Sequence, residues 1–154
     1  MTSWVVSDSG ILIATVIEES ITQKADALVG YWDAQGIPIA APSLFRYEIV
    51  AVMRKSVYRE ILTEAEAIRG RDVLLSLPIH LMFSNDLLRR GYELATQLNR
   101  PTAYDAQYLA VAEHLDCEFW TADQRLFNTV HTVLPWVKWL GNFVLPESES
   151  TSEL

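Results

Sequence analysis

Four acidic residues stand at positions where an alternating strand–helix chain can place chemistry. Asp8 follows a short apolar run, and Asp123 comes just past a second one. Glu48 falls about one turn into an expected helix, and Asp105 falls at the start of another. In a parallel α/β fold, strand C-termini and helix N-termini share one edge of the sheet, so all four carboxylates can converge there.

Convergence of these acids requires charge compensation. Two ionised carboxylates about 5 Å apart repel by roughly 3 kcal/mol at an effective dielectric constant near 20, so a four-acid cluster needs protons or a metal ion. Oxygen-only ligands predict Mg²⁺ or Mn²⁺ and not zinc. Such a site can polarise a phosphodiester and activate water, which indicates metal-dependent phosphoryl hydrolysis.

Each acid taken alone also has a structural interpretation. Asp8 can cap the helix that follows it by accepting from free N–H groups. Glu48 can interact favourably with a helix dipole. Thr102-Ala-Tyr-Asp105 has the spacing of a capping box, which would occupy Asp105 at a helix terminus. The chemical interpretation therefore depends on all four acids reaching the same edge.

The elements that would position these acids follow from apolar periodicity and turn residues. We expect strands before Asp8 and over 37–42, 77–83, 117–121 and 129–134, and helices over 11–17, 20–35, 44–58, 63–76, 86–98, 102–114 and 122–127. Leu44, Tyr47, Ala51 and Val52 are the predicted apolar stripe of the 44–58 helix. The alternation predicts an α/β fold with right-handed crossovers and a central parallel sheet of four or five strands, covered by helices on both faces.

Length and composition predict one domain that functions without a membrane. The chain has 154 residues, half of them apolar, and we expect a folded domain over 1–145 and a disordered acidic tail over 146–154. No apolar run reaches the ~18 residues of a membrane span, and Asp8 interrupts the segment where a signal peptide would lie. The single cysteine, Cys117, excludes an internal disulfide and a multi-thiolate zinc site. These features favour a cytoplasmic protein.

Charge and missing motifs narrow the chemistry further. The net charge of −8 argues at first sight against a nucleic-acid partner, but several acids lie in the terminal segment and metal-bound acids would be neutralised. The sequence contains no GxxxxGK[ST], GxGxxG, GxSxG or HExxH motif. His80, His114 and His131 lie far apart without metal-ligand spacing.

Four motifs together resemble those of the PIN-domain ribonucleases, specifically the VapC-type toxins of toxin–antitoxin pairs. The motifs are Val-Val-Ser-Asp8-Ser-Gly-Ile-Leu, Pro42-Ser-Leu-Phe-Arg-Tyr-Glu48-Ile-Val-Ala-Val, Tyr104-Asp105-Ala-Gln-Tyr-Leu-Ala-Val-Ala and Trp120-Thr121-Ala-Asp123-Gln-Arg-Leu. The resemblance covers residues 4 to 140. It implies a PIN fold, a Mg²⁺- or Mn²⁺-dependent endoribonuclease acting on RNA, and a homodimer bound by a VapB-like antitoxin.

The resemblance also implies roles for individual residues. Asp8, Glu48, Asp105 and Asp123 match the acidic quartet, which would bind the metal and act in catalysis. We expect the first three to carry the metal and Asp123 to support a second metal or the outer shell.

Supporting roles follow from neighbouring residues. Thr121 matches the hydroxyl residue of the family's TxD element. Gly10 departs from the pattern, because the family often has Ser or Thr there, and Ser9 or Ser7 is the expected substitute. By sequence proximity, Arg46 and Arg125 are the arginines expected to hold phosphates.

Two other functional classes remain open. A PIN-like domain can act as a protein-binding module without nuclease activity, with a basic side chain of its partner in the acidic cleft. A receiver domain or small phosphatase would need an adjacent acid pair at the first strand or a DxD element, and Ser7-Asp8-Ser9-Gly10 supplies neither.

Overall fold

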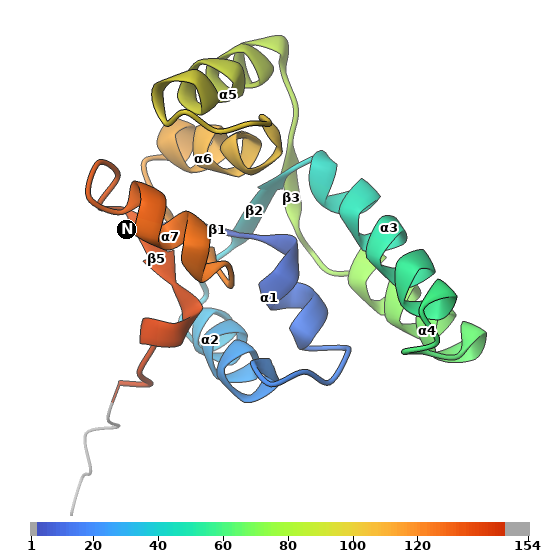
Figure 1. Cartoon of the computed structure of the whole chain (residues 1–154). Helices are drawn as coiled ribbons and strands as arrows, with labels where there is room; N and C mark the ends of the chain where they lie inside the picture. Colours follow the sequence, from blue (N-terminus) through green and yellow to red (C-terminus); the bar gives the residue numbers. More distant parts are fainter. Residues whose placement is uncertain (1–2, 147–154) are drawn as a thin grey trace, which may run out of the picture.

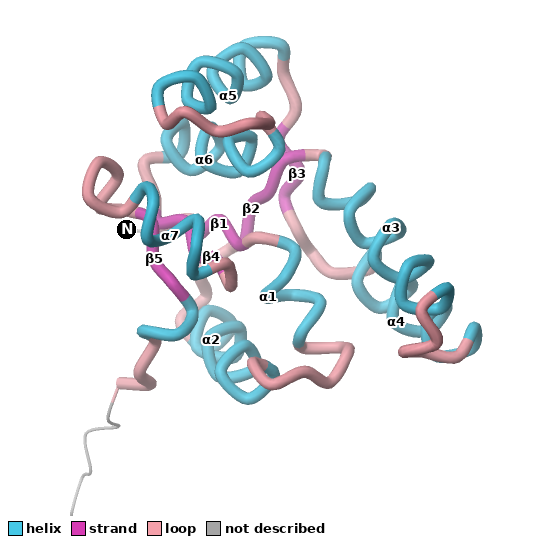
Figure 2. The backbone as a smooth tube through the Cα atoms, in the orientation of Figure 1, coloured by secondary structure: helices cyan, strands magenta, loops and turns pink. Residues whose placement is uncertain are grey.

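The computed structural model describes residues 3–146 and has a five-stranded parallel sheet at its centre (Figures 1 and 2). The strand order is β3-β2-β1-β4-β5. The strands are β1 (Val5–Ser7), β2 (Ile39–Pro42), β3 (His80–Met82), β4 (Glu118–Thr121) and β5 (Val137–Trp139). The helices are α1 (Ser9–Ala14), α2 (Thr22–Ala34), α3 (Leu44–Tyr58), α4 (Glu64–Leu75), α5 (Asn85–Gln97), α6 (Tyr104–Leu115), α7 (Gln124–Val130) and the 3₁₀ turn η1 (Leu140–Asn142). The predicted α/β fold class is confirmed.

The central strand β1 is buried on both faces of the sheet. Its alternating side chains point to opposite sides. Val6 belongs to the apolar cluster that contains Leu109 of α6, and Val5 belongs to the cluster that contains Leu28 of α2. Helices therefore cover both faces, as an all-parallel sheet requires.

Two helix pairs extend the fold beyond the sheet. Helices α3 and α4 pack against each other as a hairpin that projects from the β3 side of the sheet (Figure 1). Thr63 and Glu66 form a reciprocal capping box at the start of α4, as the sequence predicts. Helices α5 and α6 form the other pair, and α6 lies against β1, β2 and β4. Among residues 3–146, no helix combines the length and apolarity needed to cross a bilayer.

Strand register brings the first acid beside β4. Ser7, the last residue of β1, is the partner of Trp120 in β4. The Asp8 backbone N–H donates to the Trp120 carbonyl at 3.1 Å, which extends this pairing beyond the strand. The next residue of each chain segment, Asp8 and Thr121, therefore meet at the C-terminal edge of the sheet.

Three predictions about elements and their faces are wrong. The fifth strand lies at Val137–Trp139 and not at 129–134, because α7 continues to Val130 and the chain then turns through Pro135. Trp136 directly precedes this strand, and Trp139 is its last residue.

The predicted stripe of α3 is also wrong. Phe45, Ile49 and Met53 are the buried residues of that helix, whereas Tyr47 is 75% exposed. The true stripe has the same spacing but is rotated, because Phe45 is the residue that faces the sheet. The third error concerns the start of α6, whose N-cap residue is Ala103 and not Thr102. The predicted tail, 146–154, lies outside the described residues except for Pro146.

Candidate active site

Asp8 is held by three hydrogen bonds from neighbouring elements. Its Oδ1 accepts from the Ile11 backbone N–H at 2.9 Å and so caps α1. Its Oδ2 accepts from the Thr121 hydroxyl at 2.6 Å and from the Ala122 N–H at 2.9 Å. A carboxylate oxygen has two lone pairs, so Oδ2 is saturated whereas Oδ1 keeps one acceptor position for a further ligand. Capping and chemistry are therefore compatible in Asp8.

Thr121 connects Asp8 to the fourth acid. Its side chain is fully buried, and its Oγ1 donates to Asp8 while accepting from the Asp123 backbone N–H at 3.0 Å. The Asp123 carboxylate caps α7 by accepting from the Arg125 and Leu126 N–H groups at 2.9 and 3.1 Å. Asp123 is exposed, and its charge is not among those that shift the pKa of Asp8.

Glu48 reaches the site from α3 and is held by a residue of α6. The buried Tyr108 hydroxyl donates a short hydrogen bond to Glu48 Oε1. The Tyr108 ring stacks on Phe119 of β4 with centroids 5.8 Å apart, so the donor is fixed by the core. Ser9, the first residue of α1, lowers the pKa of Glu48 slightly, and its predicted supporting role stays a prediction. Tyr108 leaves Oε2 of Glu48 available.

Asp105 lies at the start of α6 but does not cap it. The predicted capping box is wrong, because the N-cap residue is Ala103, one residue later than Thr102, and it makes no side-chain cap hydrogen bond. Asp105 Oδ2 instead accepts from the Arg100 guanidinium at 3.3 Å. The carboxylate is therefore paired with a side chain and not with the helix backbone.

Two of the four predicted acids, Asp8 and Glu48, have raised pKa values, and the charge of a third, Asp105, contributes to both shifts. Burial is the main cause that raises the pKa of Asp8, and the charge of Asp105 raises it further. Burial also raises the pKa of Glu48, and the charges of Asp8 and Asp105 add to this effect. Hydrogen bonds from Thr121 to Asp8 and from Tyr108 to Glu48 oppose these shifts. The structure thus places Asp105 within electrostatic reach of Asp8 and Glu48, and Asp123 is linked to Asp8 through Thr121.

This set of donors suits Mg²⁺ or Mn²⁺, because all of them are hard carboxylate oxygens and their mutual repulsion would be relieved by a cation. With the side-chain positions found in residues 3–146, no three His, Cys, Asp or Glu residues are close enough to share one metal ion. Binding of a cation would therefore require the carboxylates to move closer to one another. For Asp105 this movement would also break or change its ion pair with Arg100.

A groove of about 610 Å³ lies beside the acids. It is mainly apolar and is lined by the start of α3, the β3–α5 connection, α5 and the start of α6; lining residues include Leu44, Tyr47, Phe83, Leu88, Ala103 and Tyr104. Phe83 is 76% exposed and Tyr104 is 64% exposed. Exposed apolar groups gathered in this way are typical of an interaction surface.

Two residues of the site were missed by the sequence analysis. A buried tyrosine needs a partner for its hydroxyl, so Tyr108, one turn after Asp105, could have been assigned to a neighbouring acid. Arg100 was not singled out, because its pairing with Asp105 depends on the path of the α5–α6 connection.

Comparison with known proteins places these residues in context. A model of the PIN domain family matches residues 5–131, a segment that contains all four acids. Ribonuclease VapC12 of Mycobacterium tuberculosis is 28% identical over 113 residues, which cover 73% of this chain and 84% of that protein. VapC ribonuclease Mb0985 of Mycobacterium bovis is 33% identical over 94 residues, covering 61% and 72% respectively. A solved toxin–antitoxin complex from Klebsiella pneumoniae has a similar fold, with a TM-score of 0.61 at 20% identity, covering 86% of this chain and 94% of that chain.

Replacing Thr121 by valine should destabilise the protein. Thr121→Val keeps the shape but removes a donor from Asp8 and leaves the Asp123 N–H without its acceptor, at an expected cost of roughly 1–3 kcal/mol. Urea unfolding of the metal-free protein measures this change. Thr129→Val is the matched control, because the Thr129 hydroxyl donates to Arg125 O on the surface of α7, and we expect a change below about 0.5 kcal/mol there. Equal stability of the two variants would contradict the proposed link.

Glu48→Gln should stabilise the metal-free protein at neutral pH. The pKa of Glu48 is raised in the folded state above its ordinary value of 4.5, so ionisation opposes folding and stability falls as pH rises through the folded-state pKa. Glutamine can still accept from Tyr108 but carries no charge. We expect a gain of roughly 1 kcal/mol at pH 7 that disappears below about pH 4. Urea unfolding with EDTA across this pH range tests the sign, with Glu19→Gln, at an exposed position before α2, as the control. A loss of stability at pH 7 would show that the repulsion is not present.

Proposed function

The chain belongs to the PIN-domain family and is a distant relative of the VapC ribonucleases, and on that premise we propose that it is a metal-dependent endoribonuclease that hydrolyses RNA phosphodiester bonds. The observation that carries the proposal is that Asp8 after β1, Glu48 in α3 and Asp105 at the start of α6 lie at the C-terminal edge of the sheet, where the charge of Asp105 acts on both Asp8 and Glu48. Burial and like charges oppose the ionisation of Asp8 and Glu48, and a divalent cation would relieve that cost.

Each acid has its own role in the proposed reaction. Asp8 offers the free acceptor position of Oδ1, and Glu48 offers Oε2, while Thr121 and Tyr108 hold the opposite oxygens. A bound Mg²⁺ or Mn²⁺ would supply a Lewis acid that activates water and offsets charge on the phosphate. Asp123, which caps α7 beside Thr121, would orient the outer part of the site or support a second ion.

The substrate would be held through its phosphates by arginines at the rim of the site. Arg46 and Arg125 are both exposed, the first two residues before Glu48 in α3 and the second two residues after Asp123 in α7. Guanidinium groups bind phosphate oxygens through paired N–H donors, and such contacts fix position without reading the base sequence.

We also propose that the protein is the cytoplasmic toxin of a toxin–antitoxin pair, forms a homodimer and binds a VapB-like antitoxin. The relatives include ribonucleases of the VapC type, and the structural neighbour is a toxin–antitoxin complex. The apolar groove beside α3, α5 and α6 supports a second copy of this chain as one occupant. A twofold interface there would bury Phe83 and Leu88, which are 76% and 48% exposed in the monomer.

A protein-binding module without nuclease activity is the second candidate. The same groove favours it, since exposed aromatic side chains mark interaction surfaces whatever the chemistry nearby. The acids distinguish the nuclease from the binding module, because a binding module does not need carboxylates that hold a catalytic metal ion. Chelator-sensitive cleavage of RNA by the purified protein would separate them.

Asp8→Asn should abolish cleavage. The substitution removes the negative charge at the most buried acid, and we expect a loss of about 100-fold or more in cleavage rate with Mn²⁺. Denaturing gel analysis of a labelled RNA, with and without EDTA, measures it. Because Asp8 also caps α1, Glu48→Gln serves as a second variant that should be inactive yet stable, and Asp26→Asn on the exposed face of α2 should retain activity. Metal-dependent cleavage that persists in both site variants would refute the assignment.

Phe83→Asp should dissociate the proposed dimer. A charge at the centre of the groove would have to be desolvated in the interface, which is unfavourable by several kcal/mol. Light scattering coupled to size-exclusion chromatography should show a shift from dimer to monomer. Tyr58→Asp, at an equally exposed aromatic residue at the far end of α3, should remain dimeric. A wild-type monomer at high micromolar concentration would contradict this part of the proposal.

A further inference from the structure

We propose that Arg100 holds Asp105 in the metal-free site, gives up that carboxylate when a divalent cation binds, and then contacts a phosphate of the RNA. The inference rests on the proposed function and adds to it a residue that acts alternately on the site and on the substrate. Its starting point is the ion pair between the Arg100 guanidinium and Asp105 Oδ2 at 3.3 Å.

Arg100 is held by its backbone while its side chain is free to move. It follows Asn99, whose positive φ of 52° turns the chain out of α5, and its N–H donates to the Ala95 carbonyl at 2.8 Å. The side chain makes one hydrogen bond in residues 3–146, through one terminal nitrogen. A guanidinium has five N–H donors, so most of its donors are available for another partner.

The pair with Asp105 has the character of a contact that can be exchanged. Its side chains are 23% and 46% exposed, and it has a single long hydrogen bond. Arg90 of α5 makes a stronger ion pair in the same chain. Its guanidinium binds both carboxylate oxygens of Glu113 in α6 at 2.6 and 3.0 Å, and it also binds Glu93 within α5. Partly exposed pairs with one contact contribute little to stability, so separating Arg100 from Asp105 costs little.

Electrostatics explain why the pair would separate in the presence of a cation. Within the described part of the chain, Arg100 is the one cation that forms an ion pair with Asp8, Glu48 or Asp105. In the metal-free protein it partly offsets the repulsion among these acids. A divalent ion at the same carboxylates would repel the guanidinium and compete with it for Asp105. In the structure Asp105 is engaged by Arg100, and no three acids among residues 3–146 are placed to share one ion.

The released guanidinium would lie at the rim of the site where RNA must approach. Its free N–H donors match a phosphate group, which binds arginine through two parallel hydrogen bonds. Arg100 would thus exchange one oxyanion, a carboxylate, for another, a phosphate. It would be a positioning residue in the metal-free state and a substrate-binding residue in the loaded one.

Arg100→Gln tests both the competition with the metal ion and the phosphate contact, because the first predicts tighter metal binding and the second predicts weaker RNA binding. Titration calorimetry with Mn²⁺ in the absence of RNA should show tighter binding, on the order of three- to tenfold, since a repelling and competing charge is removed. Cleavage of a mixed-sequence RNA at saturating Mn²⁺ should show a KM raised about tenfold, since a phosphate contact is lost. Arg100→Lys keeps the charge but not the planar donors, so Mn²⁺ affinity should stay near that of the wild type while KM rises.

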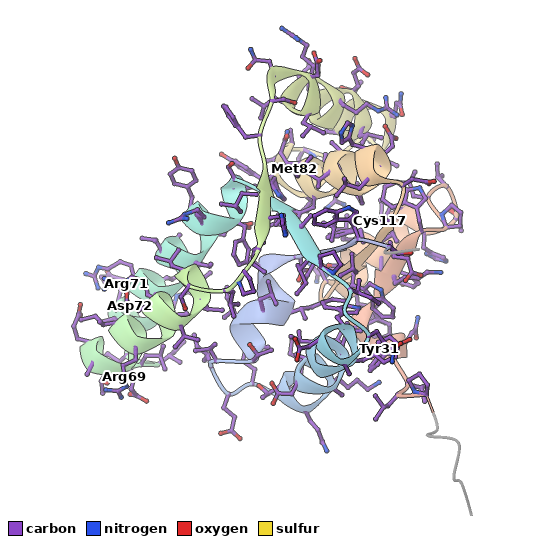
Figure 3. All side chains as sticks on the ribbon, turned by 180° about the vertical axis from the view of Figure 1, so that it is seen from behind. Tyr31, Arg69, Arg71, Asp72, Met82 and Cys117 are labelled. Atoms are coloured by element: carbon purple, nitrogen blue, oxygen red, sulfur yellow. The ribbon has the colours of Figure 1, made fainter. Side chains whose placement is uncertain are left out.

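Arg71→Gln is the matched control. Arg71 pairs with the neighbouring Asp72 on α4 at 2.9 Å, and Figure 3 shows both residues on that helix, away from the central strands. This variant should change neither Mn²⁺ affinity nor KM. Thermal unfolding of all variants detects any loss of folded protein.

Several outcomes would overturn the inference. If Arg100 merely supports the start of α6, Arg100→Gln would misplace Asp105 and weaken Mn²⁺ binding. Unchanged Mn²⁺ affinity would exclude competition for Asp105, and unchanged KM would exclude the phosphate contact. If the wild type binds Mn²⁺ but cleaves no RNA, the proposed function fails, whereas the calorimetric comparison still decides whether Arg100 competes for Asp105.

Discussion

The hydrogen bond from the buried Thr121 hydroxyl to Asp8 Oδ2 is the interaction on which the site depends. It joins the ends of β1 and β4, and it is possible only because parallel pairing aligns Ser7 with Trp120. The same hydroxyl accepts from the backbone of Asp123, so one buried side chain sets the positions of two acids. Once Oδ2 is occupied in this way, Asp8 can present only Oδ1 to a ligand. This hydrogen bond therefore links the ends of two strands and also sets the geometry of the proposed active site.

The acids illustrate a conflict between stability and chemistry. Burial raises the pKa of both Asp8 and Glu48, and the charge of Asp105 strengthens the effect. Hydrogen bonds from Thr121 and Tyr108 keep the carboxylates in place despite this repulsion. Burial and like charges thus oppose ionisation at the edge where the protein is expected to act, and the donors that hold these carboxylates come from the core.

The sequence predicted what depends on local pattern, and failed where packing decides. Alternating apolar runs located four of the five strands, and Asp8, Glu48 and Asp105 emerged as acids at one edge. The segment 129–134 is apolar enough for a strand, but its first residues complete α7 and the sheet is closed by Val137–Trp139 instead. In α3, the sequence predicted that one face of the helix is apolar but not which face is buried. The buried face contains Phe45 and not Tyr47, because Phe45 packs in the core. Arg100 was overlooked because its contact with Asp105 is made by a loop whose path no periodicity encodes.

The groove beside the acids has a consequence for how this protein can change over evolutionary time. Tyr47 and Tyr104 line it, and each immediately precedes an acid of the site, Glu48 and Asp105. A substitution that reshapes the groove to suit a new binding surface therefore acts on the same helical turns that aim the carboxylates. A change at Tyr47 or Tyr104 therefore alters the wall of the groove and the helical turn that carries an acid at the same time, whereas Phe83 and Leu88 line the groove without an adjacent acid of the site.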